Sequence, residues 1–477
     1  MPHCGARSLT DLSQAFDRLR KASRANPVPN ANQRRARLDT LRALVLDNQE
    51  EIVAAISSDF GGRSRAETEL LEMVPLLNAV QHARKSLRRW MRDELRHVAL
   101  AFQPARAWVR YEPLGVIGII SPWNYPLLLS LAPLADVLAA GNCAMLKPSE
   151  LTPAFSSLLS QIVAQRFTPD EVSVVSGGVE VAQAFSALPF DHLVFTGSTL
   201  VGRQVMRAAA ENLTPVTLEL GGKSPAIICP GYDIEKAANS VSFGKFVNAG
   251  QTCIAPDYAL VPADQAAAFA QAVIDVTRRS YPTIQENEDY SNVISERHCH
   301  RLLAAIEEAR TGGATILAHS DVPGVNGKIP PIVVLNAPAG SVLMTEEIFG
   351  PGLPVIGYQS LEEAMAFVKE RDRPLALYCF ASDHRDRDRV LAGTSSGGVT
   401  VNGTLLHIAQ DGLPFGGIGP SGTGAYHGKD GFRRFSHARA VHQIGFVNIF
   451  EHLGPPWGKL ARRVAQVLMH GLRRRNG

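Results

Sequence analysis

The chain has 477 residues, 45% of them hydrophobic and 19% charged, and a formal net charge of +3. This length predicts two or three globular domains with large apolar cores, and the small net charge gives no indication of nucleic-acid binding. The six cysteines show no CxxC spacing, which argues against a disulfide framework or a zinc ribbon and fits a reducing compartment.

The N-terminal third is predicted to be helical. Apolar residues recur at a helical period over 38–56, and the pair Gly61-Gly62 ends that helix. A second helical stretch follows over about 67–92. Residues 98–111 alternate loosely and predict an extended ribbon.

From residue 115 the pattern changes to short apolar runs that alternate with helical segments. Five candidate strands separated by four helices are typical of a parallel, doubly wound sheet. Thr152, followed by Pro153, predicts the N-cap and the first position of one of these helices. The candidate strands are residues 116–120, 143–147, 172–175, 192–195 and 216–220.

A second alternating series begins at residue 226, and the boundary falls near Gly221 and Gly222. It predicts a second α/β unit, so the expected fold class is α/β with two doubly wound domains. Candidate helices lie at 233–248, 263–279, 298–310 and 360–371, and candidate strands at 226–229, 258–262, 331–335, 353–358, 376–381 and 398–402.

Three polar residues on predicted loops or strand ends could carry chemistry. Cys253 is either a nucleophile, if its surroundings favour the thiolate, or a small buried hydrophobic residue. Glu219, between leucines, is either a partly desolvated general base or a residue that faces solvent or pairs with Lys223. Asn124 follows the first strand, where its amide either donates to an oxyanion or completes a turn that packs Trp123.

Two segments of the first unit suit a dinucleotide. Around Gly197, Ser198 and Gly202 a strand meets a helix, where open backbone N–H groups could bind a pyrophosphate. The spacing there is not GxGxxG, so a plain tight turn is the alternative. Lys147 and Glu150 follow another strand and could hydrogen-bond ribose hydroxyls, although the segment alone is an ordinary loop.

The second unit offers one further loop of this kind. Glu347 and Phe349 place a carboxylate and an aromatic ring close together in sequence. His298 and His300 flank Cys299, but on a predicted surface helix, so no metal site is expected.

Taken in order, seven motifs make the chain similar to the aldehyde dehydrogenase superfamily over about residues 35–445. Within it the chain most resembles the class 3 and coniferyl-aldehyde branch, on PWNYP at 122–126, GQTCIAPDY at 250–258 and the run from Leu413 to His437. The seven motifs are PWN at 122–124, KPSE at 147–150, FTGS at 195–198, ELGGKSP at 219–225, GQTC at 250–253, EEIFGP at 346–351 and LPFGG at 413–417.

The resemblance implies a role for each candidate residue. Cys253 would be the nucleophile, Glu219 the base that activates the deacylating water, and Asn124, with the Cys253 backbone N–H, the oxyanion hole. A second set of residues would hold the cofactor. Lys147 and Glu150 would bind its adenosine ribose, and Ser198 with the adjoining helix terminus would bind its pyrophosphate. Glu347 and Phe349 would position the nicotinamide ribose and ring, and Trp123 would line the adenine-side groove or the pocket floor.

The implied reaction is oxidation of a hydrophobic aldehyde to a carboxylic acid, with NAD preferred and NADP tolerated. The aldehyde would be aromatic and cinnamaldehyde-like, such as coniferyl aldehyde, or aliphatic with a medium or long chain. One rival passes the thioester to coenzyme A, which the presence of Glu219 weakens. Another is a non-catalytic nucleotide-binding or structural relative, which the intact set of Cys253, Glu219 and Asn124 argues against.

The resemblance also implies a homodimer, bridged by a small β extension at 97–111 and 437–448. A cofactor domain would cover 1–96 and 112–222, and a catalytic domain 223–415.

The ends of the chain carry fewer signals. Residues 1–34 match no useful motif and show no secretory signal. The most apolar stretch, 127–140, is shorter than the roughly 20 residues of a membrane span, so a soluble, cytoplasmic protein is expected. Residues 454–477 predict a basic amphipathic helix that serves as a surface or dimer contact, or associates weakly with an anionic membrane.

Overall fold

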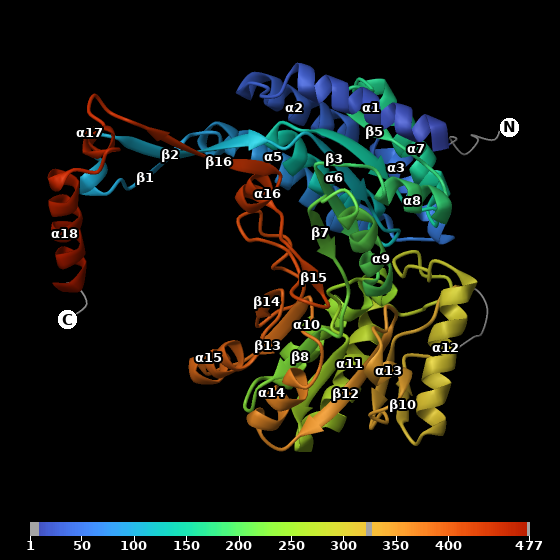
Figure 1. The fold of residues 1–477 in the computed structure, drawn as a ribbon. Helices are drawn as coiled ribbons and strands as arrows, with labels where there is room; N and C mark the ends of the chain where they lie inside the picture. Colours follow the sequence, from blue (N-terminus) through green and yellow to red (C-terminus); the bar gives the residue numbers. More distant parts are fainter. Residues whose placement is uncertain (1–8, 321–326, 475–477) are drawn as a thin grey trace. The chain divides into compact units, whose positions relative to one another are not determined.

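The computed structural model describes residues 9–320 and 327–474, which form two compact units (Figure 1). The larger unit comprises Met1–Leu87 and Pro113–Ser436, and the smaller Arg88–Glu112 and His437–Gly477. The larger unit contains two extensive sheets, and the smaller is built on a three-stranded sheet. The predicted α/β fold class, with two largely parallel sheets and a small β element, is confirmed.

The first sheet has six strands in the order β15-β7-β6-β3-β4-β5, all parallel except β15, which is antiparallel to β7. Its central strands are buried along their whole length, which explains why their sequences are continuous apolar runs rather than alternating ones. The strands are β3 Val116–Ile120, β4 Cys143–Lys147, β5 Val172–Val174, β6 His192–Thr196, β7 Val216–Glu219 and β15 Gly422–Thr423.

Helices cover both faces of this sheet. On one face α1, α8 and α9 share an apolar cluster that includes Leu12, Phe185 and Val205. On the other face lie α6 and α7, against which α2, α3 and α16 pack. The N-terminal residues that matched no motif therefore supply, as α1, part of this core. The bounds are α1 Leu9–Ala25, α2 Ala31–Asp47, α3 Gln49–Phe60, α6 Pro126–Ala140, α7 Pro153–Arg166, α8 Val179–Ser186, α9 Thr199–Ala210 and α16 Gly428–Arg434.

Thr152 occupies the N-cap position of α7 as predicted, but its side chain does not cap the helix. The open N–H groups of Ala154 and Phe155 instead donate to the carboxylate of Asp59, at the end of α3, each at 2.8 Å. A carboxylate at the positive end of the helix satisfies two unpaired donors at once.

The predicted helix over 67–92 is broken into three parts. A short helix α4, Arg65–Thr68, and the main helix α5, Val74–Trp90, are separated by a π-helical turn, Glu69–Met73. π-Helical turns are rare in proteins overall, and those that occur are frequently found at functional sites.

The second sheet has seven strands in the order β10-β11-β12-β9-β8-β13-β14, parallel except for β10. Helices α10 and α11 pack on one face, and α14 and α15 on the other. The sequence pattern missed β10. The strands are β8 Pro225–Ile228, β9 Tyr258–Pro262, β10 Thr315–Ala318, β11 Ile332–Leu335, β12 Gly352–Tyr358, β13 Ala376–Phe380 and β14 Gly398–Val401, and the helices α10 Ile234–Phe246, α11 Ala266–Ser280, α12 Glu296–Thr311, α13 Val342–Thr345, α14 Leu361–Lys369 and α15 His384–Gly393.

The smaller unit contains β1 Glu94–Arg96, β2 Arg106–Pro113 and β16 Ser436–Gln443, in the order β1-β2-β16. The ribbon predicted from residue 98 begins only at Arg106, because Leu100–Phe102 form a 3-10 turn. Two helices follow β16, namely α17 Ile449–Leu453 and α18 Lys459–Arg474.

Most of α18 is exposed from Lys459 to His470, and Arg475 of the predicted basic tail lies outside the described residues. Homodimer formation through the small sheet and membrane association of the tail both stay predictions. No helix within 9–320 and 327–474 is long and apolar enough to cross a membrane.

Candidate active site

Cys253 lies on the loop between α10 and β9, directly after a run of left-handed backbone. Asn248 and Ala249 have φ values of 51° and 50°, and Gly250 follows at 75°. Left-handed backbone is unfavourable for residues with a Cβ, so other contacts must hold this turn. One is the carboxylate of Glu67, which accepts a hydrogen bond from Asn248 N at 2.8 Å.

The residues next to Cys253 are fixed by their side chains. Thr252 Oγ1 is hydrogen-bonded to Tyr125 OH at 2.8 Å. The Gln251 side chain makes three hydrogen bonds of 2.9 Å to main-chain atoms, namely Asn248 O, Asn292 O and Ile294 N. The loop therefore holds Cys253 in one place.

Two cavities meet at Cys253. One has a volume of about 180 Å³ and an almost wholly apolar lining, whereas the other, of about 370 Å³, is lined by polar groups that include Asn124, Glu219 and Glu347. The apolar lining includes Leu70, Leu71, Leu128, Phe243, Ile254, Leu405 and Leu406. A small molecule in the first cavity and a larger one in the second would both reach the thiol.

Glu219 ends β7 and is 2% exposed. Neither carboxyl oxygen has a hydrogen-bond partner among the described residues, and burial raises its pKa well above the usual range. Lys223, the partner considered from the sequence, pairs with Asp257 instead. Glu219 is thus a buried carboxyl that faces the polar cavity, which suits a general base rather than a structural ion pair.

Asn124 is 3% exposed and its side-chain amide donates to Gln251 O at 3.1 Å. It lines the same cavity as Cys253 and Glu219. An amide nitrogen carries two N–H groups, so one remains to donate toward this cavity. The structure therefore brings the three candidate catalytic residues together.

Burial raises the pKa of the Cys253 thiol, and the carboxyl groups of Glu347 and Glu219 add to this effect. The backbone N–H groups of Cys253 and Ile254 act in the opposite direction. The thiol form is therefore favoured in the protein alone.

A third cavity, of about 780 Å³, lies beyond the carboxyl ends of β3, β4 and β6. The chain runs from β3 outward through β4 to β5 and returns on the opposite side of β3 as β6. The crevice at such a switch in strand order is the usual nucleotide site of an open α/β sheet. Its lining includes Trp123, Lys147, Glu150, Gly197 and Ser198.

Lys147 and Glu150 form an ion pair at this edge, with Lys147 Nζ 2.8 Å from Glu150 Oε2. The lysine side chain is 2% exposed and that of the glutamate 44%. Ser198 is the N-cap of α9, and its hydroxyl accepts from Val201 N at 3.4 Å. The positive end of α9 therefore opens on the cavity, which suits a pyrophosphate.

Gly202 is not among the residues that line this cavity, and its predicted contact with the cofactor stays a prediction. A Cβ at this position would lie 2.6 Å from Leu220 Cδ2. The glycine therefore allows α9 to pack closely against the segment after β7.

Glu347 and Phe349 line the polar cavity beside Cys253. The Phe349 ring packs edge-on against Trp123 at 5.3 Å. Burial and the nearby Asp257 raise the pKa of Glu347 to about 8, against a hydrogen bond from the Gly222 backbone and the charges of Lys223 and Lys245.

The sequence pattern missed one side of the large cavity. Arg297, His298 and Arg301 line it from α12, and the His298 ring lies 5.4 Å from that of Trp123. His298 therefore faces a cavity rather than the surface. The helical spacing of these three residues, once Ser295 is taken as the N-cap, could have indicated a shared face. Among the described residues, no three His, Cys, Asp or Glu side chains are grouped to hold a metal ion.

Comparison with known proteins gives consistent matches along nearly the whole chain. A family model described as the aldehyde dehydrogenase family matches residues 3–441. A probable coniferyl aldehyde dehydrogenase of Pseudomonas aeruginosa is 48% identical over 96% of both chains. A coniferyl aldehyde dehydrogenase of a Pseudomonas species is 42% identical over 96% of both. The solved substrate-bound state of Staphylococcus aureus AldH is 36% identical with a TM-score of 0.90, over 96% of this chain and 99% of that chain.

Proposed function

The chain belongs to the aldehyde dehydrogenase family, as its motifs predicted, and is an NAD(P)-dependent aldehyde dehydrogenase; we propose that it oxidises aromatic aldehydes of the coniferyl type through a thioester on Cys253. The observation that carries this proposal is the position of Cys253 where an apolar cavity meets a polar one. Asn124 and Glu219 line the polar cavity beside it.

The first step is attack of the Cys253 thiolate on the aldehyde carbon. The carbonyl oxygen becomes an oxyanion, which the free N–H of the Asn124 amide and the backbone N–H of Cys253 stabilise. Because Asn124 is already held by Gln251 O, little reorganisation is needed when this charge develops.

The residues around the large cavity fit a dinucleotide. Lys147 and Glu150 would hold the adenosine ribose, the N-terminus of α9 at Ser198 the pyrophosphate, and Glu347 with Phe349 the nicotinamide end. When bound, the nicotinamide would supply the hydride acceptor for the substrate carbon, so that Cys253 would carry the acyl group as a thioester. In the protein alone the buried carboxyl of Glu347 lies against the Gly221 backbone and accepts a hydrogen bond from the Gly222 backbone.

Hydrolysis of the thioester completes the reaction. Glu219 takes a proton from water as the water attacks the acyl carbon, and the Cys253 thiolate leaves. The carboxylate can act in this way because no ion pair or hydrogen bond from the described residues occupies its oxygens. This supports water, rather than coenzyme A, as the acyl acceptor.

The lining of the small cavity supports the substrate class. Apolar side chains surround it, and polar groups enter only at a few points, among them Asp411 and His427. A flat aromatic aldehyde would bury its ring against leucines, and a phenolic hydroxyl could donate to the Asp411 carboxylate. The names of the relatives from Pseudomonas agree with this class.

Initial rates of NADH formation with coniferyl aldehyde, cinnamaldehyde and a series of aliphatic aldehydes test the proposal, with mass spectrometry of the product. We expect the highest kcat/KM for the aromatic aldehydes and a free carboxylic acid as product. Preference for long aliphatic aldehydes would overturn the substrate class, and an acyl-coenzyme A product formed when coenzyme A is added would overturn the hydrolytic step.

A further inference from the structure

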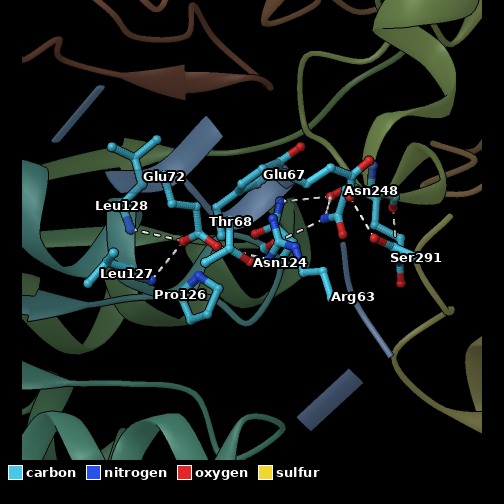
Figure 2. Close-up of polar contacts among 12 residues, drawn as sticks. Arg63, Glu67, Thr68, Glu72, Asn124, Pro126, Leu127, Leu128, Asn248 and Ser291 are labelled. Atoms are coloured by element: carbon cyan, nitrogen blue, oxygen red, sulfur yellow. Dashed lines mark hydrogen bonds and ion pairs between the residues drawn. The ribbon is translucent and has the colours of Figure 1, made fainter. Parts of the chain in front are cut away.

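Arg63 is a buried arginine directly behind Asn124. Its Nη1 donates to Asn124 O at 3.0 Å and lies 2.9 Å from Glu72 Oε1, and neither charged side chain is exposed (Figure 2). The guanidinium carbon also lies 4.9 Å from the centre of the Tyr125 ring. The arginine thus contacts the backbone of the proposed oxyanion-hole residue and is not among the residues that line the polar cavity.

Glu72 continues this contact to the next helix. Its second oxygen accepts from Leu127 N at 2.9 Å and Leu128 N at 3.1 Å, in the first turn of α6. The Arg63–Glu72 pair therefore spans the loop from Asn124 to the start of α6. Glu72 stands on the π-helical turn, which also presents Leu70 and Leu71 to the apolar cavity.

A second arm of the network reaches the Cys253 loop. Glu67 accepts from Asn248 N at 2.8 Å and from Ser291 Oγ at 2.5 Å. The Asn248 amide donates to Asn124 O at 3.0 Å and to Gln251 O at 3.2 Å. The main-chain oxygen of Asn124 therefore accepts two hydrogen bonds. The side-chain amide of Asn124 donates to the main-chain oxygen of Gln251, two residues before Cys253. Figure 2 shows the two arms converging on Asn124.

Stability alone accounts poorly for this arrangement. A fully buried ion pair pays a large desolvation cost and is a weak source of stability. In addition, Arg63 Nε and Nη2 have no hydrogen-bond partner among the described residues. Catalytic geometry, in contrast, depends on positions held to within about 0.5 Å.

We infer that Arg63, Glu72 and Asn248 are positioning residues, which fix the Asn124 amide relative to Cys253 so that an oxyanion formed on the sulfur-bound carbon meets its donor. This inference rests on the proposed function. None of the three touches the reacting atoms. Arg63 and Glu72 act through the Asn124 carbonyl and the start of α6, and Asn248 acts through the Asn124 and Gln251 carbonyls.

The test compares two reactions of Cys253. Acylation by an aldehyde forms an oxyanion, whereas alkylation by iodoacetamide does not. In Arg63→Lys we expect the pre-steady-state rate of NADH formation to fall by about 10–100-fold, since small displacements of reacting groups cost up to about 10². The alkylation rate and the Kd for NAD should stay within about threefold of wild type on that same reasoning.

Arg34→Lys is the matched control. Arg34 is also buried and donates to Ala139 O at 3.1 Å and Ala140 O at 2.7 Å, so it holds the far end of the same helix α6. In Arg34→Lys we expect a lower thermal stability and an unchanged ratio of the acylation rate to the alkylation rate of Cys253. If this ratio fell equally in Arg63→Lys and Arg34→Lys, the inference would be overturned, because the fall would reflect a general disturbance of α6.

A double-mutant cycle with Asn124→Ala separates this inference from the proposed function. Asn124→Ala alone should slow acylation by about 10²–10³, and Arg63→Lys should then add less than about threefold because its effect passes through Asn124. Full additivity would overturn the positioning role and leave the oxyanion hole intact. No effect of Asn124→Ala would instead overturn the oxyanion role itself, and the inference with it.

Asn248→Gly provides a second route if Arg63→Lys does not fold. Glycine adopts a φ of 51° without strain, so the variant removes only the side-chain donors to Asn124 O and Gln251 O. The same selective loss of acylation is expected, about tenfold by the same reasoning. Acylation within about twofold of wild type in a folded Asn248→Gly protein would overturn the inference.

Discussion

The carboxyl of Glu219 raises the pKa of the Cys253 thiol in the cavity that both residues line, after the larger effects of burial and of Glu347. Burial in turn raises the pKa of Glu219 itself, whose oxygens have no hydrogen-bond partner among the described residues. Burial therefore disfavours ionisation of both groups, and the Glu219 carboxylate further disfavours ionisation of Cys253. Both are needed in ionised form at different steps, so the reaction should depend strongly on pH.

The first prediction concerns the thiol. Removing the Glu219 charge should lower the pKa of Cys253, because a neighbouring carboxylate disfavours a thiolate. Alkylation of Cys253 by iodoacetamide, followed against pH in the cofactor-free enzyme, should therefore shift toward lower pH in Glu219→Gln. An unchanged or higher midpoint would show that the two groups do not interact.

The second prediction concerns stability. The folded pKa of Glu219 lies above its unfolded value of about 4.3, so the folded state binds more protons between the two values. Stability then falls as pH rises from about 4.3 through the folded pKa. Replacing Glu219 by Gln removes this loss, so the variant should gain free energy of unfolding relative to wild type as pH rises. Urea denaturation at several pH values measures the difference, and a constant difference would contradict the raised pKa.

Glu219→Gln should also separate the two halves of the reaction. Hydride transfer should survive in part, whereas hydrolysis should slow because an amide cannot take a proton from water. Rapid quenching followed by mass spectrometry should then show the acyl group on Cys253. If hydrolysis keeps its rate and no adduct accumulates, another group is the base.

Cys253→Ala should abolish dehydrogenase activity, by about 10⁴-fold or more, as loss of a covalent nucleophile does. NAD binding should remain near normal, since Cys253 only adjoins the nucleotide cavity. Cys299→Ala is the control, because Cys299 is the other partly exposed cysteine among the described residues and lies in the packing of α12. Turnover of Cys253→Ala within about tenfold of wild type would remove Cys253 from the mechanism.

The strands were predictable because burial on both faces forces apolar runs. Cys143–Lys147 and Val116–Ile120 have the bounds expected from sequence, and their carboxyl ends place Asn124 and Lys147 correctly beside the cavities. Four of the seven motifs, at 122–124, 147–150, 195–198 and 219–225, begin at or next to the end of one of these buried strands.

Contacts between distant segments could not be predicted from one sequence. Asp59 rather than Thr152 caps α7, and Arg63 lies against Asn124 although 61 positions separate them. Periodicity tells which face of a helix is buried but not which partner meets it. At Gly202 the sequence could not separate two reasons for a glycine, because close packing and phosphate binding both favour a residue without a Cβ. The structure shows the close packing.

The ion pair between Lys147 and Glu150 gives the enzyme two opposing groups at the proposed adenosine ribose site. The lysine is buried and fixed at the end of β4, whereas the glutamate is about half exposed and can turn toward solvent. A carboxylate accepts hydrogen bonds from the ribose hydroxyls of NAD but repels the 2′-phosphate of NADP. Lys147, in contrast, would attract that phosphate.

We therefore predict that NAD is preferred and NADP tolerated. Repulsion between charges about 4 Å apart amounts to roughly 1–4 kcal/mol, which corresponds to about fivefold to several hundredfold in kcat/KM. Glu150→Gln should narrow or reverse the ratio of kcat/KM for the two cofactors, because Lys147 then acts unopposed. Glu171→Gln, which removes a partly exposed carboxylate paired with Arg37 at 2.9 Å, should leave the ratio unchanged. A wild-type preference for NADP, or equal ratios in Glu150→Gln and wild type, would show that Glu150 does not contact the ribose.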